Sequence, residues 1–378
     1  MPALTSRERV LRTLNHERVD RVPIDLGGRI SSMAEGIYTK LKDYFDIYDH
    51  NGSESINPFL TIEDYDERIL EAFNVDFRRV YFNGPESIII QKNPDGTYIN
   101  EWGLTIQKIG PYIQRITHPL RSANIDDLNS YRWPNPSRSQ EEISKLREKA
   151  RYLYENTNYA IVADAVNGGI FEYAQHLRGM EEFFTDMMVN KKFANALLDK
   201  ILGILISFYN VYLDIVGEYV QIVLYPDDYG MQTDLLISPK LFREMIKPRV
   251  KKLFDFIKSK TNAKMMIHTD GSVYNIIDDL IEIGVDILNP CQPYAKDMEP
   301  EKLKSKFGQR IVFHGGIDQQ KILRKGNIQD VRDEVKQKIE DFASGGGYIL
   351  APAHNIEEDT PVENVIAVFE AAKEFGKY

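Results

Sequence analysis

The chain has 378 residues, of which 43% are hydrophobic and 28% charged, a globular composition that excludes disordered and collagen-like proteins. Its formal net charge of -10 argues against a nucleic-acid-binding surface. The longest apolar stretch, residues 201–220, is interrupted by polar groups at helical spacing and predicts a buried helix, not a membrane span. A single cysteine permits no internal disulfide, and residues 1–10 lack the apolar core of an export signal. We therefore expect a cytoplasmic protein that binds neither nucleic acid nor a membrane.

The first 120 residues contain a helical lead-in, two candidate strands and an insertion. Residues 1–20 are typical of a helix, and the apolar runs at 21–28 and 77–84 each predict a strand. Residues 85–120 alternate between Asn-Pro-Asp-Gly and Ile-Gly-Pro turns, which predicts a small antiparallel sheet. An insertion at this point would lie over one end of the main fold, as a lid, as a wall of the substrate site, or as a contact within a homodimer.

From residue 160 onward, one pattern recurs six times: a short apolar run, a polar or glycine-containing turn, and an amphipathic helical segment. The runs with their turns occupy residues 160–165, 219–228, 263–271, 285–293, 310–318 and 347–355. Helical segments follow them, for example at 167–188 and 239–260. Continuous apolar strands that alternate with helices are typical of a parallel sheet buried on both faces.

Together with the two upstream strands, these six units make eight, the number that closes a (β/α)8 TIM barrel. We therefore predict a single barrel domain over residues 1–378, with residues 85–120 as an inserted segment. The alternative, an open doubly wound sheet, would place a G-x-G-x-x-G phosphate-binding motif after its first strand. The sequence DLGGRISS at that point lacks this spacing.

Polar side chains follow the predicted strands at their carboxyl ends, where a barrel of this kind builds its active site. They are Asp25, Asp164, Asn167, Asp227, Asp228, His268, Asp270, Asn289, Cys291, Gln292, His314, Asp318, His354 and Asn355. Three of the seven histidines are therefore predicted to lie at one rim of the barrel. Cys291 has no activating partner in the sequence, and we interpret it as a small buried apolar side chain.

His268 and Asp270 lie two residues apart at the end of one strand, so their side chains share a face and can bind the same metal ion. His354, on the last strand, would complete a set of two histidines and one carboxylate, and His314 is the competing third ligand. Catalytic zinc takes three protein ligands and keeps one position open, but the same set also suits non-haem iron or another divalent ion. A histidine at a strand end can equally be a hydrogen-bonded structural residue.

The segment after the strand at 219–228 predicts a loop that opens onto the same rim, because the next helix begins only near residue 238. In this loop we expect Asp228 and Gln232 to orient the substrate or a neighbouring histidine. The alternative is that Asp227 and Asp228 cap the following helix. The substrate-binding candidates are Arg29, Asn167, Tyr225, Tyr229, Gln232 and Asn289, and the catalytic candidates are Asp228, His314 and His354.

Five segments of the sequence together resemble the uroporphyrinogen decarboxylase superfamily. They are TSRERVLRTLNHERVDRVPIDLGG (5–28), DDYGMQTDLLISPKLFREMIKPRVKKLFDFIK (227–258), HTDGSVYNIIDDLIEIGVDILNPCQP (268–293), FHGGIDQQKIL (313–323) and GGGYILAPAHNIEEDTPVENVIAVFEAA (345–372). The resemblance covers nearly the whole chain, and HNIEEDTPVENV at 354–365 is its most specific part. It implies a (β/α)8 barrel with one of two activities: the decarboxylase of haem synthesis, or a cobalamin-linked methyltransferase with a catalytic zinc.

The decarboxylase branch of this superfamily has an R-Q-A-G-R motif near its N-terminus, which holds a substrate with eight carboxylates. The segment IDLGGRISSM offers only Arg29 at this place, and bidentate guanidinium contacts to carboxylates are not readily replaced. His354 does match a histidine of the decarboxylase pattern. A decarboxylase is therefore the runner-up.

Methyltransferases of the superfamily that act on a thiol bind zinc through H-x-C on one strand and a cysteine on the last. The resemblance places His268, Asp270 and His354 at these positions, so both thiolates are absent. Two histidines and one carboxylate leave a net charge of about +1 on zinc, a stronger Lewis acid that suits an oxygen leaving group. The resemblance thus favours methyl transfer from a small methoxylated or methylated donor to the Co(I) corrinoid of a partner protein. Two roles without catalysis stay open as well: a barrel that binds a ligand without turnover, and an inactive subunit of a corrinoid complex.

Overall fold

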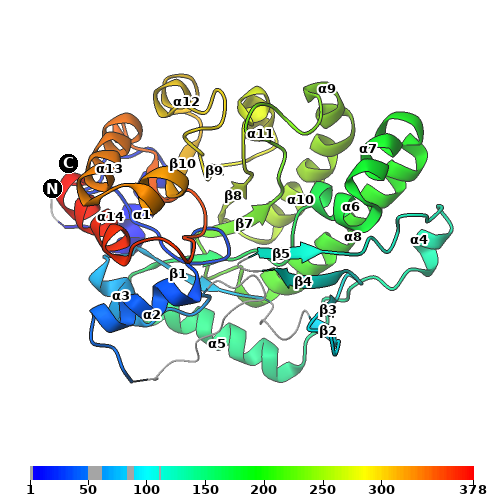
Figure 1. Cartoon of the computed structure of the whole chain (residues 1–378), viewed down its shortest axis with the longest axis horizontal. Helices are drawn as coiled ribbons and strands as arrows, with labels where there is room; N and C mark the ends of the chain where they lie inside the picture. Colours follow the sequence, from blue (N-terminus) through cyan, green and yellow to red (C-terminus); the bar gives the residue numbers. More distant parts are fainter. Residues whose placement is uncertain (1–2, 50–61, 83–88, 110–111) are drawn as a thin grey trace.

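Seven parallel strands curl into a barrel in the computed structural model, which describes residues 3–49, 62–82, 89–109 and 112–378 (Figure 1). In their order around the sheet they are β1 (Phe77–Val80), β6 (Ala160–Ala163), β7 (Ile222–Pro226), β8 (Lys264–His268), β9 (Ile287–Asn289), β10 (Val312–Ile317) and β11 (Tyr348–Pro352). Every neighbouring pair is parallel. The predicted barrel is therefore confirmed, although residues 83 and 84 of its second predicted strand lie outside the described residues.

Residues 21–26 occupy the eighth position, between β11 and β1, and thereby close the barrel. The Leu350 N–H donates to Pro23 O on one side, and the Asp76 N–H donates to Ile24 O on the other. The sequence predicts a regular strand here, but the structure contains only isolated bridges. The reason is local: Pro23 has no N–H, and the Ile24 N–H is bound by the side chain of Asp76 instead of a strand backbone.

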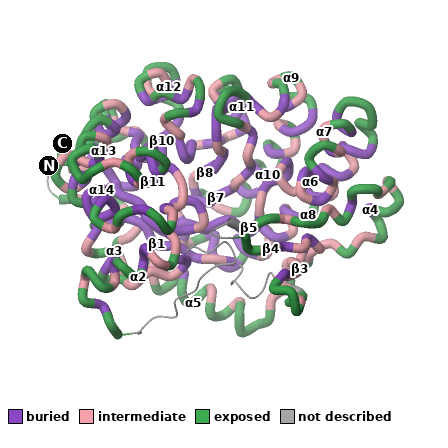
Figure 2. Tube along the Cα trace, viewed as in Figure 1, coloured by how far each residue is buried: buried purple, intermediate pink, exposed green. Residues whose placement is uncertain are grey.

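Helices cover the outside of the barrel, and Figure 2 shows their outer faces exposed around a buried centre. They are α1 (Ser6–Leu14), α2 (Glu35–Tyr44), α3 (Glu67–Ala72), α4 (Asp127–Ser130), α5 (Gln140–Asn156), α6 (Ile170–Arg178), α7 (Met180–Val189), α8 (Lys191–Val216), α9 (Pro239–Leu241), α10 (Lys247–Lys260), α11 (Ile277–Glu282), α12 (Pro300–Phe307), α13 (Ile328–Ala343) and α14 (Val362–Phe375). The C-terminus lies beside the described N-terminal segment, where the Tyr378 N–H donates to Asp20 O (Figure 1).

The interior of the barrel changes from apolar to polar along the strands. One layer consists of buried apolar side chains, which pack with Val10 and Leu14 of α1: Phe77, Val162, Leu224, Met266, Ile287, Val312 and Ile349. Residues two positions further along a strand share its face. At these positions five strands carry polar side chains: Arg79, Asp164, His268, Asn289 and His314. The same alternation that fills the core therefore builds a polar layer at the carboxyl ends.

Two helical segments that the sequence predicts as continuous are interrupted. Residues 167–188 form α6 and α7, which meet at Gly179, where φ is 94° and glycine is favoured. Residues 239–260 form α9, a π-helical turn at Phe242–Ile246 and α10. Pro248 lacks an N–H, so it is accommodated in the first turn of α10 and not in a continuous helix.

α8 is the helix among the described residues that is long and apolar enough to cross a membrane, judged by its length and composition alone. It contains most of residues 201–220, which the sequence predicts as a buried helix. In the structure, 56% of its most apolar window is buried, and it packs against α10, α6 and α7.

The insertion forms a second, antiparallel sheet of four strands, as the sequence predicts. They are β2 (Ile89–Lys92), β3 (Tyr98–Asn100), β4 (Thr105–Ile109) and β5 (Tyr112–Arg115); residues 85–88 and 110–111 of the predicted segment lie outside the described residues. Trp102, between β3 and β4, is fully buried and stacks on Tyr173 of α6 with 3.9 Å between ring centroids. Its Nε1 donates to Oδ1 of Asn167, in the loop after β6. The inserted sheet is thereby anchored to the carboxyl ends of the barrel strands.

Candidate metal centre and substrate cavity

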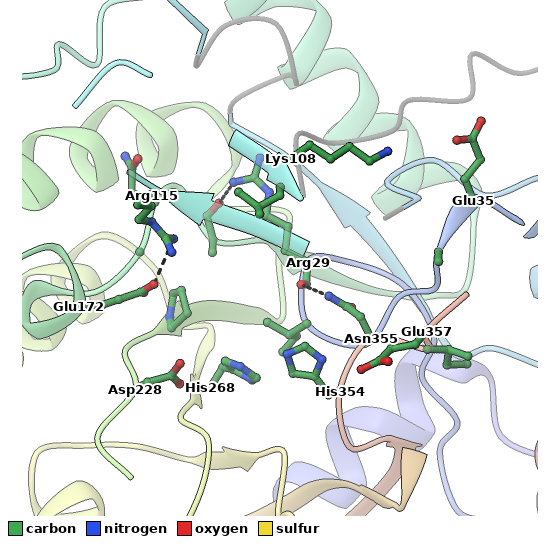
Figure 3. A pocket seen from close by; sticks show the side chains of 18 of the residues that line it. Arg29, Glu35, Lys108, Arg115, Glu172, Asp228, His268, His354, Asn355 and Glu357 are labelled. Carbon is green, nitrogen blue, oxygen red and sulfur yellow. Dashed lines mark hydrogen bonds and ion pairs between the residues drawn. The ribbon is translucent and has the colours of Figure 1, made fainter. Parts of the chain in front are cut away.

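A cavity of about 1090 Å³ opens at the carboxyl ends of the barrel strands (Figure 3). The strand ends and the loops after them line one side, with Asp228, His268 and His354 close together. The insertion lines another side through Asn100, Glu101, Lys108, Ile113 and Arg115. Of the roles considered for the insertion, the structure therefore supports that of a cavity wall.

His268, Asp270 and His354 bring three potential ligand atoms together beside this cavity. Nε2 of His268 lies 3.8 Å from Oδ1 of Asp270, and Nε2 of His354 lies 3.9 Å from Oδ2 of the same carboxylate. Ligand atoms of all three residues lie within 4.8 Å of one another. The His268 side chain is nearly buried, whereas that of His354 is 39% exposed. The cluster therefore has one enclosed side and one side that opens to the cavity.

This donor set fits a zinc ion. Tetrahedral zinc with bonds of about 2.0–2.2 Å holds its ligand atoms roughly 3.4 Å apart, so only a small contraction of the cluster is needed. Oδ1 of Asp270 is buried and has no hydrogen-bond partner among the described residues, which leaves it available as a ligand. Two imidazoles and a carboxylate also suit iron, so the ligand types do not name the ion.

A second carboxylate lies next to the cluster. Oδ1 of Asp228 accepts a hydrogen bond from the Asp270 N–H at 2.9 Å. Burial raises the pKa of Asp228. Burial also disfavours a charge on His268, but the carboxylates of Asp270 and Asp228 outweigh it and raise the pKa of that imidazole. The negative charge around the two histidines favours a cation at this position.

His314 and Asn289 lie behind the cluster and outside the cavity lining. Both side chains are fully buried. Nε2 of His314 lies 2.8 Å from Oδ2 of Asp25, and its Nδ1 accepts from Nδ2 of Asn289 at 2.7 Å. Oδ1 of Asn289 lies 2.5 Å from Nδ1 of His268. The structure therefore does not bring His314 or Asn289 to the cavity, where the sequence predicts His314 as a catalytic group or third ligand and Asn289 as a substrate contact.

Tyr225 and Tyr229 also lie outside the cavity lining. Both rings are fully buried, and both hydroxyls donate to Oδ2 of Asp227, at 2.8 and 2.9 Å. The Asp227 carboxylate accepts two further hydrogen bonds, from the N–H groups of Phe171 and Glu172 in the first turn of α6. Asp227 therefore caps α6 and not the helix that follows it in the sequence. The two tyrosines hold this cap, so the structure does not bring them to the cavity, where the sequence predicts them to bind substrate.

We expect Tyr229→Phe to lower the free energy of unfolding by about 1–3 kcal/mol, because a hydrogen bond to a buried carboxylate is lost. Zinc affinity and the KM for the donor should stay at their wild-type values, since the hydroxyl faces Asp227. Chemical denaturation, zinc titration and steady-state kinetics measure these quantities. Tyr44→Phe, at an exposed position, is the matched control. A raised KM with unchanged stability would return Tyr229 to the substrate site.

Arg29 and Asn167 line the main cavity, whereas Gln232 does not. The Arg29 guanidinium lies 3.3 Å from Oε1 of Glu63. Nδ2 of Asn167 is buried without a hydrogen-bond partner among the described residues, so it is a donor available to a ligand. Gln232 is exposed and lines a separate small hollow next to His354. The buried position of Cys291 agrees with its interpretation as a small apolar side chain.

Glu101, Arg115 and Glu172 are among the charged residues of the cavity wall that the sequence does not single out. Burial raises the pKa of Glu101, in the turn after β3, to about 7. Arg115 on β5 lies 3.5 Å from Glu172 on α6, so an ion pair joins the insertion to the barrel (Figure 3). No sequence signal identifies these residues, because their place depends on how the insertion folds over the barrel.

A closed parallel barrel, with polar side chains converging on a cavity at its carboxyl ends, has the architecture of a TIM-barrel enzyme. The uroporphyrinogen decarboxylase (URO-D) family profile matches residues 103–375, which is most of the chain. The chain therefore belongs to the uroporphyrinogen decarboxylase family.

Relatives with two kinds of activity are similar to this chain. The methylcobamide:CoM methyltransferase MtaA of Methanosarcina barkeri is 29% identical over 140 residues, which span 37% of this chain and only 38% of that protein. A uroporphyrinogen decarboxylase of Microcystis aeruginosa is 23% identical over 282 residues, 72% of this chain and 73% of that protein. A solved methyltransferase from Methanosarcina mazei shares the fold, with a TM-score of 0.66 and 21% identity over 98% of this chain and 99% of that chain.

Proposed function

We propose that this protein is a metal-dependent methyltransferase, which moves a methyl group from a small methoxylated or methylated donor to the Co(I) corrinoid of a partner protein. The observation that carries the proposal is the cluster of His268, Asp270 and His354, which opens onto a large cavity. The MtaA relative is named as a methylcobamide:CoM methyltransferase, which supports a corrinoid as the partner in methyl transfer here.

His268, Asp270 and His354 would hold zinc with its fourth position open to the cavity. When bound, zinc supplies Lewis-acid assistance to the heteroatom that leaves the methyl group. One carboxylate and two neutral histidines leave a net charge of about +1, whereas two thiolates would neutralise the ion. The set therefore suits an oxygen-bound methyl group better than activation of a thiol.

The transfer breaks the bond between the donor heteroatom and the methyl carbon and forms a bond between that carbon and cobalt. Cobalt supplies the electron pair of the new bond and passes from Co(I) to Co(III), while the leaving heteroatom keeps the old pair and takes a proton from solvent. Asp228 and Asn167 line the cavity, where they orient the donor with its methyl group toward the barrel mouth. The open mouth leaves room for a corrinoid carried by the partner.

A porphyrinogen decarboxylase is the alternative within the same family, and the Microcystis relative supports it. A substrate with eight carboxylates needs a cavity rich in positive charge. Among the described residues, and leaving His268 and His354 aside, the cavity lining contains six acidic residues against four lysines and arginines, and one of these, Arg29, is engaged with Glu63. The charge of the lining therefore favours the methyltransferase.

Metal analysis of protein purified without chelators, followed by a screen of methyl donors with reduced cobalamin, tests the proposal. We expect one zinc or comparable ion per chain and a donor-dependent loss of the Co(I) absorbance. Stoichiometric metal without transfer to any corrinoid acceptor would favour a barrel that binds a ligand without turnover. Absence of a saturable metal site would contradict the proposal.

We expect Asp228→Asn to lower kcat/KM for the donor by about 10- to 100-fold, because a misoriented donor reacts slowly. The new amide keeps an oxygen that can accept from the Asp270 N–H, so the fold should be unchanged and one zinc ion should still bind per chain. Steady-state kinetics and zinc titration provide the two readings. Asp234→Asn, in the exposed part of the same loop, is the control. Unchanged kinetics in Asp228→Asn would remove Asp228 from the site.

A further inference from the structure

A line of buried hydrogen bonds leads from His268 away from the cavity and into the barrel interior. Nδ1 of His268 meets Oδ1 of Asn289 at 2.5 Å, and Nδ2 of Asn289 meets Nδ1 of His314 at 2.7 Å. Nε2 of His314 then meets Oδ2 of Asp25 at 2.8 Å, and Asp25 accepts two bonds from Arg79, at 2.6 and 3.0 Å. We call Asn289, His314, Asp25 and Arg79 the buried network.

The charge at the far end of the buried network determines where each proton lies. Burial opposes ionisation of Asp25, but Arg79 and His314 lower its pKa to about 2. A carboxylate can only accept hydrogen bonds, so Nε2 of His314 carries a proton. With that proton on Nε2, the lone pair of the neutral imidazole lies on Nδ1, which faces Nδ2 of Asn289, an amide nitrogen that can only donate. His314 therefore accepts at Nδ1.

Acceptance at Nδ1 of His314 fixes the orientation of the Asn289 amide. Its NH2 group must face His314, and its carbonyl oxygen must face His268. His268 can meet a carbonyl oxygen only with an N–H, so its proton lies on Nδ1. Nε2 of His268 then keeps its lone pair, on the side where Asp270 lies.

We infer that Asn289, His314, Asp25 and Arg79 are positioning residues, which hold His268 in the Nδ1–H tautomer whose Nε2 can bind a metal ion. The inference rests on the proposed metal centre and assigns a role to residues that touch neither metal nor substrate. The reversed amide would require the proton of His268 on Nε2 and would block that ligand atom. The buried network thus selects the metal-binding tautomer before any metal arrives.

The backbone around Asn289 allows its side chain to contact His314 closely. The Gly316 N–H donates to Pro290 O, which joins β10 to the residue after Asn289. Gly315 has a φ of 103°, and a Cβ at this position would lie 2.4 Å from Pro290 O. Glycine at position 315 therefore allows the close approach that keeps His314 against Asn289.

Nitrogen-15 NMR of the metal-free protein reports the tautomer of His268, and competition with a chelator reports the zinc affinity. At a pH at which its imidazole is neutral, wild-type His268 should be in the Nδ1–H form. Asn289→Ala should mix the two tautomers and weaken zinc binding by about 10- to 100-fold. Asn289→Asp keeps an acceptor for the His268 proton, so it should restore the Nδ1–H form and most of the zinc affinity.

Asn364→Ala is the matched control, because Asn364 is equally buried, lies outside the cavity lining and donates two hydrogen bonds to the backbone. It should lower stability without changing the zinc affinity. An Nε2–H tautomer in wild-type His268, or an Asn289→Ala affinity within about twofold of wild type, would overturn the inference. Wild-type protein that binds no zinc would overturn the proposed metal centre instead. If Asn289→Ala does not fold, the tautomer of wild-type His268 and the zinc affinity of Asn289→Asp still test the inference.

Discussion

Replacing His268 or Asp270 by alanine should abolish stoichiometric zinc binding. Each residue supplies one of only three ligands, and Asp270 is the one that contacts both histidines. Loss of a direct ligand should exceed the roughly 10- to 100-fold loss of affinity that follows removal of an outer hydrogen-bond partner. Methyl transfer should disappear with the metal. Titration with zinc in the presence of a competing chelator measures the affinity.

His118→Ala is the control for the metal-ligand variants. His118 is half-buried, and its Nδ1 lies 2.8 Å from the backbone oxygen of His176, away from the cluster. The His118→Ala variant should bind zinc with the affinity of the wild type. A saturable site of wild-type affinity in both His268→Ala and Asp270→Ala would show that any bound metal lies elsewhere.

Asp76→Ala should lower the free energy of unfolding by about 3–5 kcal/mol, the typical cost of removing one partner of a buried ion pair. The Asp76 carboxylate is fully buried and accepts hydrogen bonds from Arg9, Arg21 and the Ile24 N–H. These contacts attach the irregular segment at 21–26 to β1, so Asp76→Ala loses interactions that close the barrel. Urea denaturation followed by circular dichroism measures the effect.

Asp255→Ala provides the comparison for this stability effect. Asp255 forms an ion pair with Lys251 on the exposed face of α10, and such pairs contribute at most about 1 kcal/mol. Asp76→Asn, which keeps one acceptor oxygen, should fall between the two. Equal losses in Asp76→Ala and Asp255→Ala would mean that Asp76 does not hold the barrel closed.

The barrel could be predicted because its strands are buried on both faces and therefore appear as continuous apolar runs, as in β6 and β11. The segment at 21–26 has the same appearance, yet its ladder of backbone hydrogen bonds is incomplete, because Pro23 has no N–H and the Ile24 N–H is bound by the side chain of Asp76. The apolar character of a segment does not reveal that some of its strand hydrogen bonds are missing.

The choice between His354 and His314 as third ligand depends on where each histidine lies relative to the end of its strand. His314 lies within β10 and faces the barrel interior, whereas His354 lies two residues beyond the end of β11 and reaches the cavity. Sequence patterns locate strand ends only to within a few residues. Such a small error is enough to confuse a residue inside a strand, as His314 is, with one just beyond a strand end, as His354 is. Asp270 lies two residues beyond the end of β8, where it continues the alternation of that strand, so its pairing with His268 could be predicted.

The buried network could not be predicted, because Asp25, Arg79, Asn289 and His314 come from four different strand positions. Their contacts depend on the register between strands, which no local pattern encodes. Arg79 illustrates the difficulty: an arginine in a strand is usually assigned to the surface, but this one lies in the barrel interior between Asp25 and Asp164.

The most direct test of the proposed function compares two reactions of the same zinc-loaded protein. With the correct methoxylated or methylated donor, the Co(I) absorbance of reduced cobalamin should fall at a rate proportional to protein concentration, and His268→Ala should remove this activity. With uroporphyrinogen, the same preparation should form no coproporphyrinogen above the rate without protein. Coproporphyrinogen formation above that background, without methyl transfer from any donor, would contradict the account and assign Arg29 and His354 to a decarboxylase.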